Sequence, residues 1–321
     1  MTTPPEQGGP DHTGPAGSRP ELDGTVTWAQ LQREAERRLA SAGIASPALD
    51  ARRIVERASG LDGADYVLGL DERASTRSVA WFDAMVARRL TGEPLQYVVG
   101  SWGFRTLDLL VDRRVLIPRP ETEEVAGWAL AELDRRRAPG AAAPSGAGEP
   151  ERLVAVDLGT GSGAIALSLV AERPWVEVWA TDISPDALDV ASANLAGLGG
   201  PARRVTLAEG SWFAALPSEL AGRVDLVVSN PPYVAADDDL PAEVADWEPS
   251  GALVPGPTGL EALLPMVVEA PKWLARPGVL VVELAPDQAE RVAAAALEAG
   301  FVEARVEVDL SGRRRAVVAR I

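Results

Sequence analysis

One short segment carries groups suited to holding a planar nitrogen. The apolar run VDLVVS (224–229) is followed by Asn230-Pro231-Pro232-Tyr233. The Asn230 side-chain oxygen and the Pro231 carbonyl oxygen are hydrogen-bond acceptors, and two consecutive prolines make the backbone there rigid. The Tyr233 ring can stack on a flat group. Two acceptors aimed at the two N–H bonds of an amide or amine would orient its delocalised lone pair. We predict Asn230, Pro231 and Tyr233 as catalytic, and Asn230 to Tyr233 as substrate-binding.

A methyl group on a sulfonium is the electrophile that suits such a site. The sulfonium leaves as a neutral thioether, so the transfer itself needs no titratable base. The chain has no cysteine, and its single histidine, His12, lies in a polar N-terminal segment. Histidine catalysis, disulfides and thiolate or imidazole metal sites are therefore disfavoured, and no metal is predicted. A simple turn after a strand is the plainer interpretation of Asn-Pro-Pro.

A glycine-rich segment upstream predicts a loop that binds S-adenosylmethionine. It reads DLGTGSG (157–163), follows the strand-like run LVAVD and continues into AIALSLVAE. Glycine permits a sharp turn and close approach of a ligand. Asp182 ends the next strand-like run, 19 residues after Gly163, where a carboxylate can accept hydrogen bonds from both ribose hydroxyls. The predicted cofactor-binding residues are Gly159, Thr160, Gly161, Ser162, Gly163, Asp182, Trp212 and Asn230.

Two aromatic positions have competing interpretations. Trp212 and Phe213 follow the third predicted strand and could flank the adenine ring, or they could simply fill the core. Phe104 could form a wall of the substrate pocket and is included among the substrate-binding residues, although core packing explains it as well.

The glycine loop by itself leaves a second cofactor open. Gly159, Gly161 and Ala164 also satisfy a relaxed dinucleotide fingerprint, which would indicate a nicotinamide-dependent oxidoreductase. That hypothesis leaves the segment from Asn230 to Tyr233 unexplained. A non-catalytic adaptor protein is a third possibility, and it predicts that Asn230 is dispensable.

Alternating strand and helix patterns from residue 152 onward predict the fold. Several strand-like runs are continuously apolar, as expected of parallel strands covered on both faces. We predict an α/β fold with a seven-stranded, mostly parallel, doubly wound sheet and an antiparallel hairpin at one edge. The predicted strands are LVAVD, EVWAT, RVTLAE, VDLVVS, VLVVEL, EARVEV and RRAVVA.

The N-terminal part has a different organisation. Residues 1–24 are rich in Gly and Pro and are expected to be disordered, and residues 25–92 are expected to form a small all-helical domain beginning with a capping box at Thr27. Residues 93–115 are predicted to form a β-hairpin linker, and residues 116–321 the cofactor-binding domain. Within that domain, residues 137–150 are expected to be a flexible insertion.

Charge and hydropathy narrow the choice of partners. The formal net charge is −16, which argues against a nucleic-acid partner, because such proteins usually present a basic face. No apolar run is long enough to span a membrane, and the N-terminus does not resemble a signal peptide. We expect a cytoplasmic monomer that binds neither membrane nor nucleic acid.

The chain resembles the release factor glutamine methyltransferases, the PrmC/HemK family, from about Thr27 to the C-terminus. The string from Leu116 to Glu123 (LIPRPETE) is the most specific part of the likeness. Other shared features are Gly92-Glu93-Pro94, Gln96-Tyr97, Phe104, the Gly159 loop, Trp212-Phe213, the Asn230 motif and Glu248-Pro249.

The resemblance implies a Rossmann-like methyltransferase domain and a helical domain that docks the substrate. Its members methylate the side-chain amide of the glutamine in the Gly-Gly-Gln motif of class I peptide chain release factors. By motif, Gly159 to Gly163, Asp182 and Trp212 would bind the cofactor, and Asn230 to Tyr233 would hold the glutamine. Methylation of an adenine amine in nucleic acid, or of a ribosomal-protein glutamine, stays open as an alternative.

Overall fold

The computed structural model describes residues 26–137 and 152–321, and the chain divides between Thr91 and Gly92 into two compact units. The predicted tail with His12 lies outside these residues, as does the predicted insertion apart from Arg137, which ends a helix. Within the two described ranges, no helix combines the length and apolar character that crossing a membrane requires.

The smaller unit is helical, as predicted. Its first helix begins with the expected capping box: Thr27 Oγ1 accepts from the Gln30 N–H, and Gln30 Oε1 accepts from the Thr27 N–H. A buried ion pair joins the second and fourth helices, with Arg89 Nε 2.7 Å from Asp50 Oδ2. The helices are α1 (Trp28–Ser41), α2 (Pro47–Ser59), α3 (Gly63–Gly69) and α4 (Thr76–Leu90).

The larger unit begins with a helix where part of a hairpin was predicted. Residues 95–99 form α5 (Leu95–Val99), and the hairpin is confined to β1 (Ser101–Phe104) and β2 (Leu107–Leu110). Pro94 precedes α5, and Gly100 ends it with a left-handed φ of 74°, which glycine adopts without strain. The Tyr97 hydroxyl donates to the Val115 carbonyl at 2.5 Å and fixes this helix. A five-residue segment is too short for its periodicity to distinguish helix from strand.

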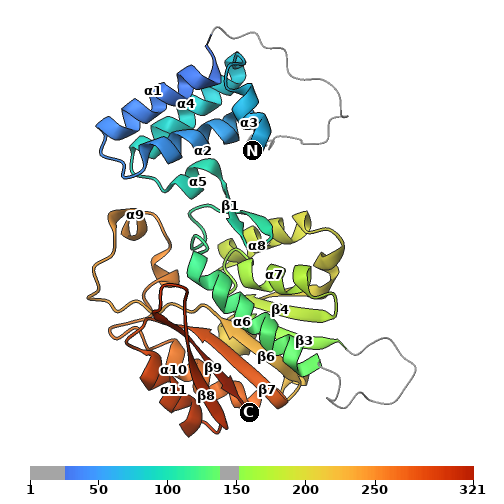
Figure 1. Cartoon of the computed structure of the whole chain (residues 1–321). Helices are drawn as coiled ribbons and strands as arrows, with labels where there is room; N and C mark the ends of the chain where they lie inside the picture. Colours follow the sequence, from blue (N-terminus) through green and yellow to red (C-terminus); the bar gives the residue numbers. More distant parts are fainter. Residues whose placement is uncertain (1–25, 138–151) are drawn as a thin grey trace, which may run out of the picture. The chain divides into compact units, whose positions relative to one another are not determined.

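The seven predicted strands form one sheet, so the predicted fold class is confirmed. Its order is β5-β4-β3-β6-β7-β9-β8, in which the first five strands are parallel and β9 and β8 form an antiparallel edge. The path can be followed by colour in Figure 1. The strands are β3 (Leu153–Leu158), β4 (Val176–Asp182), β5 (Val205–Glu209), β6 (Val224–Ser229), β7 (Leu274–Glu283), β8 (Glu303–Val308) and β9 (Arg314–Arg320).

Each face of the sheet carries its own apolar core. Along β7, Val279 and Val281 pack into the core that contains α6 and α7, while Leu280 and Val282 pack into the core that contains α10 and α11. Burial on both faces explains why these strands are continuously apolar. The helices are α6 (Pro120–Arg137), α7 (Ala164–Glu172), α8 (Pro185–Gly197), α9 (Ala242–Ala245), α10 (Leu263–Glu269) and α11 (Ala289–Glu298).

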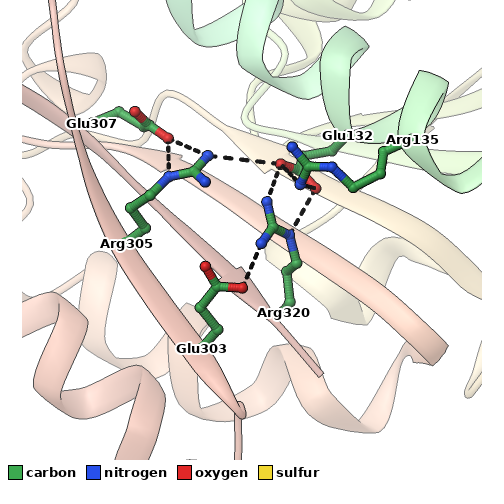
Figure 2. A network of polar contacts seen from close by, with 6 residues as sticks. All are labelled: Glu132, Arg135, Glu303, Arg305, Glu307 and Arg320. Atoms are coloured by element: carbon green, nitrogen blue, oxygen red, sulfur yellow. Dashed lines mark hydrogen bonds and ion pairs between the residues drawn. The ribbon is translucent and has the colours of Figure 1, made fainter.

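A polar network holds α6 against the antiparallel edge of the sheet (Figure 2). Glu132 on α6 is 5% exposed and accepts two hydrogen bonds from Arg320 on β9, at 2.7 and 2.9 Å. Arg135 contacts the same carboxylate, and Glu303 pairs with Arg320. A bidentate pair of this kind fixes the orientation of both side chains, so it fixes the position of α6 along β9. This matters because the first turn of α6 contributes to the site.

Candidate active site

A cavity of about 360 Å³ opens at the carboxyl ends of β3, β4 and β6. This is where a doubly wound sheet places ligands, and the volume lies in the usual range for small-molecule pockets. Its lining includes the glycine loop, Asp182, Trp212 and Asn230, which the sequence predicted to meet. β3 and β6 are adjacent and parallel, as expected, so the glycine loop and Asn230 follow neighbouring strand ends.

The glycine loop requires its glycines. Gly159, Gly161 and Gly163 have φ values of 72°, 55° and 85°, a region that other residues enter with strain. A Cβ on Gly159 would lie 3.4 Å from the Trp212 ring, which lines the same cavity. A side chain at position 159 would therefore crowd Trp212 at the wall of the cavity.

Two carboxylates hold the loop. Asp157 Oδ2 accepts from Thr160 Oγ1 at 2.7 Å and from the Ala166 N–H at 3.1 Å. Asp157 Oδ1 is buried with no hydrogen-bond partner among the described residues, although Asp157 lines the cavity. Burial raises the pKa of this carboxyl to about 6. An acceptor left over at a cavity wall can bind a donor group of a ligand.

Asp182 joins the loop to the end of the next strand. Its Oδ2 accepts from the Gly161 N–H and its Oδ1 from the Ser184 N–H, both at 2.9 Å. Each carboxylate oxygen keeps further acceptor capacity for a ligand. Ile183, which the sequence analysis did not select, lines the cavity and is 70% exposed. Its place directly after the strand-ending acid was the signal that could have identified it.

A chain of hydrogen bonds orients the Asn230 side chain. Asn230 Nδ2 donates to Thr122 Oγ1 at 3.1 Å, and Thr122 Oγ1 donates to Glu283 Oε2 at 2.8 Å. The Tyr233 hydroxyl donates to Glu283 Oε1 at 3.1 Å. Asn230 and Thr122 both line the cavity. With its NH₂ group bound to Thr122, Asn230 has its Oδ1 available as an acceptor.

The other three residues of the motif differ in how they relate to the cavity. Pro232 lines the cavity, while Pro231 is buried, and Pro231 and Tyr233 are not among the residues that line it. Gln288 Nε2 donates to the Tyr233 carbonyl at 2.8 Å, which fixes the backbone after the two prolines. Stacking of Tyr233 on a substrate amide stays a prediction, because the contact recorded for its hydroxyl is with Glu283.

Two predicted aromatic contacts are instead part of the core. Phe104 is 1% exposed, packs in the cluster with Leu109 and Val125 and is not among the residues that line the cavity, so core packing accounts for it and its role as a pocket wall stays a prediction. Phe213 is fully buried and stacks on Trp273 with ring centroids 5.7 Å apart. Both aromatic rings gain more from burial in a packed core than from a half-exposed wall.

The string at 116–123 has a structural role. The buried Glu248 carboxylate accepts from the Ile117 N–H at 3.1 Å and from Arg119 Nη2 at 2.5 Å. These contacts fix the segment immediately before α6, and Thr122 lies in the first turn of that helix. The string therefore places the Thr122 hydroxyl between Asn230 and Glu283.

Glu283 is the main site residue to which sequence reasoning assigned no role, since an acid at a strand end could equally be solvated or cap a helix. It is fully buried at the end of β7, and burial raises its pKa from 4.5 to about 7, opposed by its bonds to Thr122 and Tyr233 and by the Arg315 charge. Thr122 lies 161 residues away in sequence, so no local pattern relates the two. The only available signal was an acid at a strand end inside an apolar run.

Glu283 gives the stability of the larger unit a defined pH dependence. Between pH 4.5 and 7 the folded chain keeps the Glu283 proton that the unfolded chain releases, so the free energy of unfolding falls as pH rises. The shift corresponds to about 3 kcal/mol. We expect Glu283→Gln to remove this decline, so that its stability relative to wild type increases from pH 4.5 to 8. Urea unfolding, followed by tryptophan fluorescence at several pH values, measures the free energy of unfolding of both proteins. A constant difference between the two free energies across this pH range would contradict the expectation.

The sheet order, the glycine loop after its first strand and the Asn230 motif after its fourth define the chain as a Rossmann-like methyltransferase. The chain belongs to the release factor glutamine methyltransferase family. It matches the PrmC N-terminal domain over residues 30–100 and the methyltransferase small domain over residues 149–245.

Curated relatives cover nearly the whole chain. It is 42% identical over 298 residues to a release factor glutamine methyltransferase of Cereibacter sphaeroides, covering 91% of this chain and 98% of the relative. Proteins of the same name from Mycolicibacterium smegmatis and Deinococcus radiodurans are each 38% identical, covering 88% and 90% of this chain and 93% and 97% of the relatives.

Proposed function

We propose that this chain methylates the side-chain amide nitrogen of the glutamine in the Gly-Gly-Gln motif of class I peptide chain release factors, with S-adenosylmethionine as methyl donor. The observation that carries the proposal is the orientation of Asn230, whose Nδ2 is bound to Thr122 and whose Oδ1 is therefore available at the cavity. The names of the relatives support the choice of substrate.

The residues at the cavity fit S-adenosylmethionine. Asp182 would accept from the ribose hydroxyls, and the unpartnered Asp157 Oδ1 would accept from an ammonium or amide donor; the lining of the cavity by both residues supports this. Trp212 and Ile183 offer apolar surface for the adenine ring. When bound, the cofactor supplies a methyl carbon activated by a sulfonium. A nicotinamide cofactor would leave the segment from Asn230 to Tyr233 without a role, because hydride transfer does not need two acceptors that hold a planar nitrogen.

The chain's own residues act by holding the amide. Asn230 Oδ1 and the Pro231 carbonyl accept from the two N–H bonds of the glutamine amide and turn its lone pair toward the methyl group. No described side chain is needed as a base in this step, because the proton that nitrogen carries after methylation is acidic enough to pass to water. Tyr233 is proposed to pack on the planar amide.

A transfer assay with methyl-labelled S-adenosylmethionine tests the proposal. Purified release factor, duplex DNA, transfer RNA and ribosomal proteins are each incubated with the enzyme and counted. The proposal expects label on the release factor and its loss when the glutamine of the Gly-Gly-Gln motif is changed to alanine. Label on DNA or RNA would support the adenine alternative, and label on a ribosomal protein would support the other glutamine substrate; either result in place of release factor labelling contradicts the proposal.

A further inference from the structure

The hydrogen-bond chain from Glu283 to Asn230 has a direction. At pH 8, above its raised pKa of about 7, Glu283 is a carboxylate that only accepts hydrogen bonds, so the Thr122 hydroxyl donates its single hydrogen bond to it. The Thr122 oxygen then offers Asn230 only lone pairs. The group of Asn230 that faces Thr122 must be its NH₂, in agreement with the 3.1 Å contact from Nδ2.

The opposite orientation of the Asn230 amide would be penalised. With Oδ1 facing Thr122 Oγ1, two acceptors would oppose each other, and the NH₂ group would point at the cavity. That orientation presents donors to an amide NH₂, which is itself a donor. An asparagine without this constraint has two amide orientations of similar shape.

The three side chains come from separate parts of the larger unit. Thr122 lies in the first turn of α6, Asn230 follows β6, and Glu283 ends β7. Thr122 is 4% exposed and Glu283 fully buried, so water competes little for these bonds. The Tyr233 hydroxyl takes the second oxygen of Glu283, which leaves Oε2 for Thr122.

We propose that Thr122 and Glu283 are positioning residues that select the orientation of the Asn230 amide in which Oδ1 faces the substrate nitrogen. This inference rests on the proposed function and deepens it, because it explains how one end of a nearly symmetric side chain is chosen. Neither residue contacts the reacting atoms. Their effect is on the fraction of enzyme in which Asn230 is competent.

A pair of variants at position 122 separates this role from packing. Thr122→Val keeps the shape and removes the hydroxyl, whereas Thr122→Ser keeps the hydroxyl and removes a methyl group. At pH 8, where Glu283 is ionised, we expect kcat for release factor methylation to fall about 20-fold in Thr122→Val and to stay within about threefold of wild type in Thr122→Ser. The Kd for S-adenosylmethionine, measured calorimetrically, should change less than about threefold in both.

A purely structural role predicts the reverse order, because serine leaves a methyl-sized hole in a buried site and valine does not. Near-normal kcat in Thr122→Val, or a kcat in Thr122→Ser as low as that in Thr122→Val, overturns the proposal.

The orientation of Asn230 can also be followed without turnover. Asparagine occurs twice in the chain, at Asn194 and Asn230, so asparagine-selective ¹⁵N labelling gives two side-chain NH₂ groups. Asn194 Nδ2 is bound to the Leu110 and Ser162 carbonyls, at 3.0 and 2.9 Å, and serves as the internal reference.

We expect the Asn230 NH₂ signal to be downfield and slow to exchange with water in wild type and in Thr122→Ser. In Thr122→Val it should move upfield and exchange faster, while the Asn194 signal stays unchanged. An unchanged Asn230 signal in Thr122→Val overturns the inference. This measurement holds whether or not a release factor is the substrate, so the two proposals fail separately.

Discussion

Replacing Asn230 with alanine is expected to lower kcat about 1000-fold, the size of loss seen when a positioned hydrogen-bonding group is removed from a reacting centre. The loss falls on turnover because Asn230 Oδ1 is proposed to hold the substrate amide. The Kd for S-adenosylmethionine should rise less than about tenfold, since the cavity keeps the glycine loop and Asp182. Stopped-flow or single-turnover methylation of release factor, with calorimetry for the cofactor, separates the two quantities.

Asn230→Asp is the isosteric companion to this variant. A carboxylate at position 230 would place an acceptor against Thr122 Oγ1, whose hydroxyl already donates its hydrogen bond to Glu283. The variant should therefore be about as inactive as Asn230→Ala despite its matching shape. Turnover above about a tenth of wild type in either variant would contradict the role given to Asn230.

The second large effect is expected at Asp182, on cofactor affinity. Its carboxylate accepts from the backbone of Gly161 and Ser184 and lines the cavity, so Asp182→Ala removes support for the loop as well as the acceptors for a ribose. Losing one or two charge-assisted hydrogen bonds of about 1.5–3 kcal/mol each corresponds to a Kd for S-adenosylmethionine about 100-fold higher. At saturating cofactor, kcat should stay within about fivefold of wild type.

A matched control for Asp182 lies four residues further along. Asp186 is exposed in the first turn of α8 and does not line the cavity, and Asp186→Ala makes the same change of charge. We expect its cofactor Kd to match wild type. Equal weakening in both variants would mean that the charge near the cavity, and not the hydrogen bonds of Asp182, determines affinity.

The sequence was sufficient to predict the sheet because the composition of its strand segments is distinctive. Short runs such as VDLVVS are largely apolar without alternation, as expected of parallel strands covered on both faces, and they recur between longer helical segments. The glycine loop, Asp182 and Asn230 were then predicted to lie close together, because the carboxyl ends of neighbouring parallel strands lie at the same end of a sheet. The structure brings these residues to one cavity.

Two kinds of feature were beyond sequence reasoning. Residues 95–99 have strand-like composition, yet Pro94, Gly100 and the Tyr97 hydroxyl bond make a helix, and five residues are too few for periodicity to decide. The bonds that join Thr122, Asn230 and Glu283 span up to 161 residues, and only the packed sheet brings the three side chains within reach. Phe104 shows the opposite case, in which a conspicuous aromatic residue packs in the core and is not among the residues that line the cavity.

Tandem mass spectrometry of a release factor incubated with the enzyme and S-adenosylmethionine tests the central claim most directly, because it names the atom group that the Asn230 array holds. The result expected is one added methyl group, located on the side chain of the Gly-Gly-Gln glutamine and missing when Asn230→Ala replaces wild type. A methyl group found on any other residue, or glutamine methylation that persists in Asn230→Ala, would contradict it.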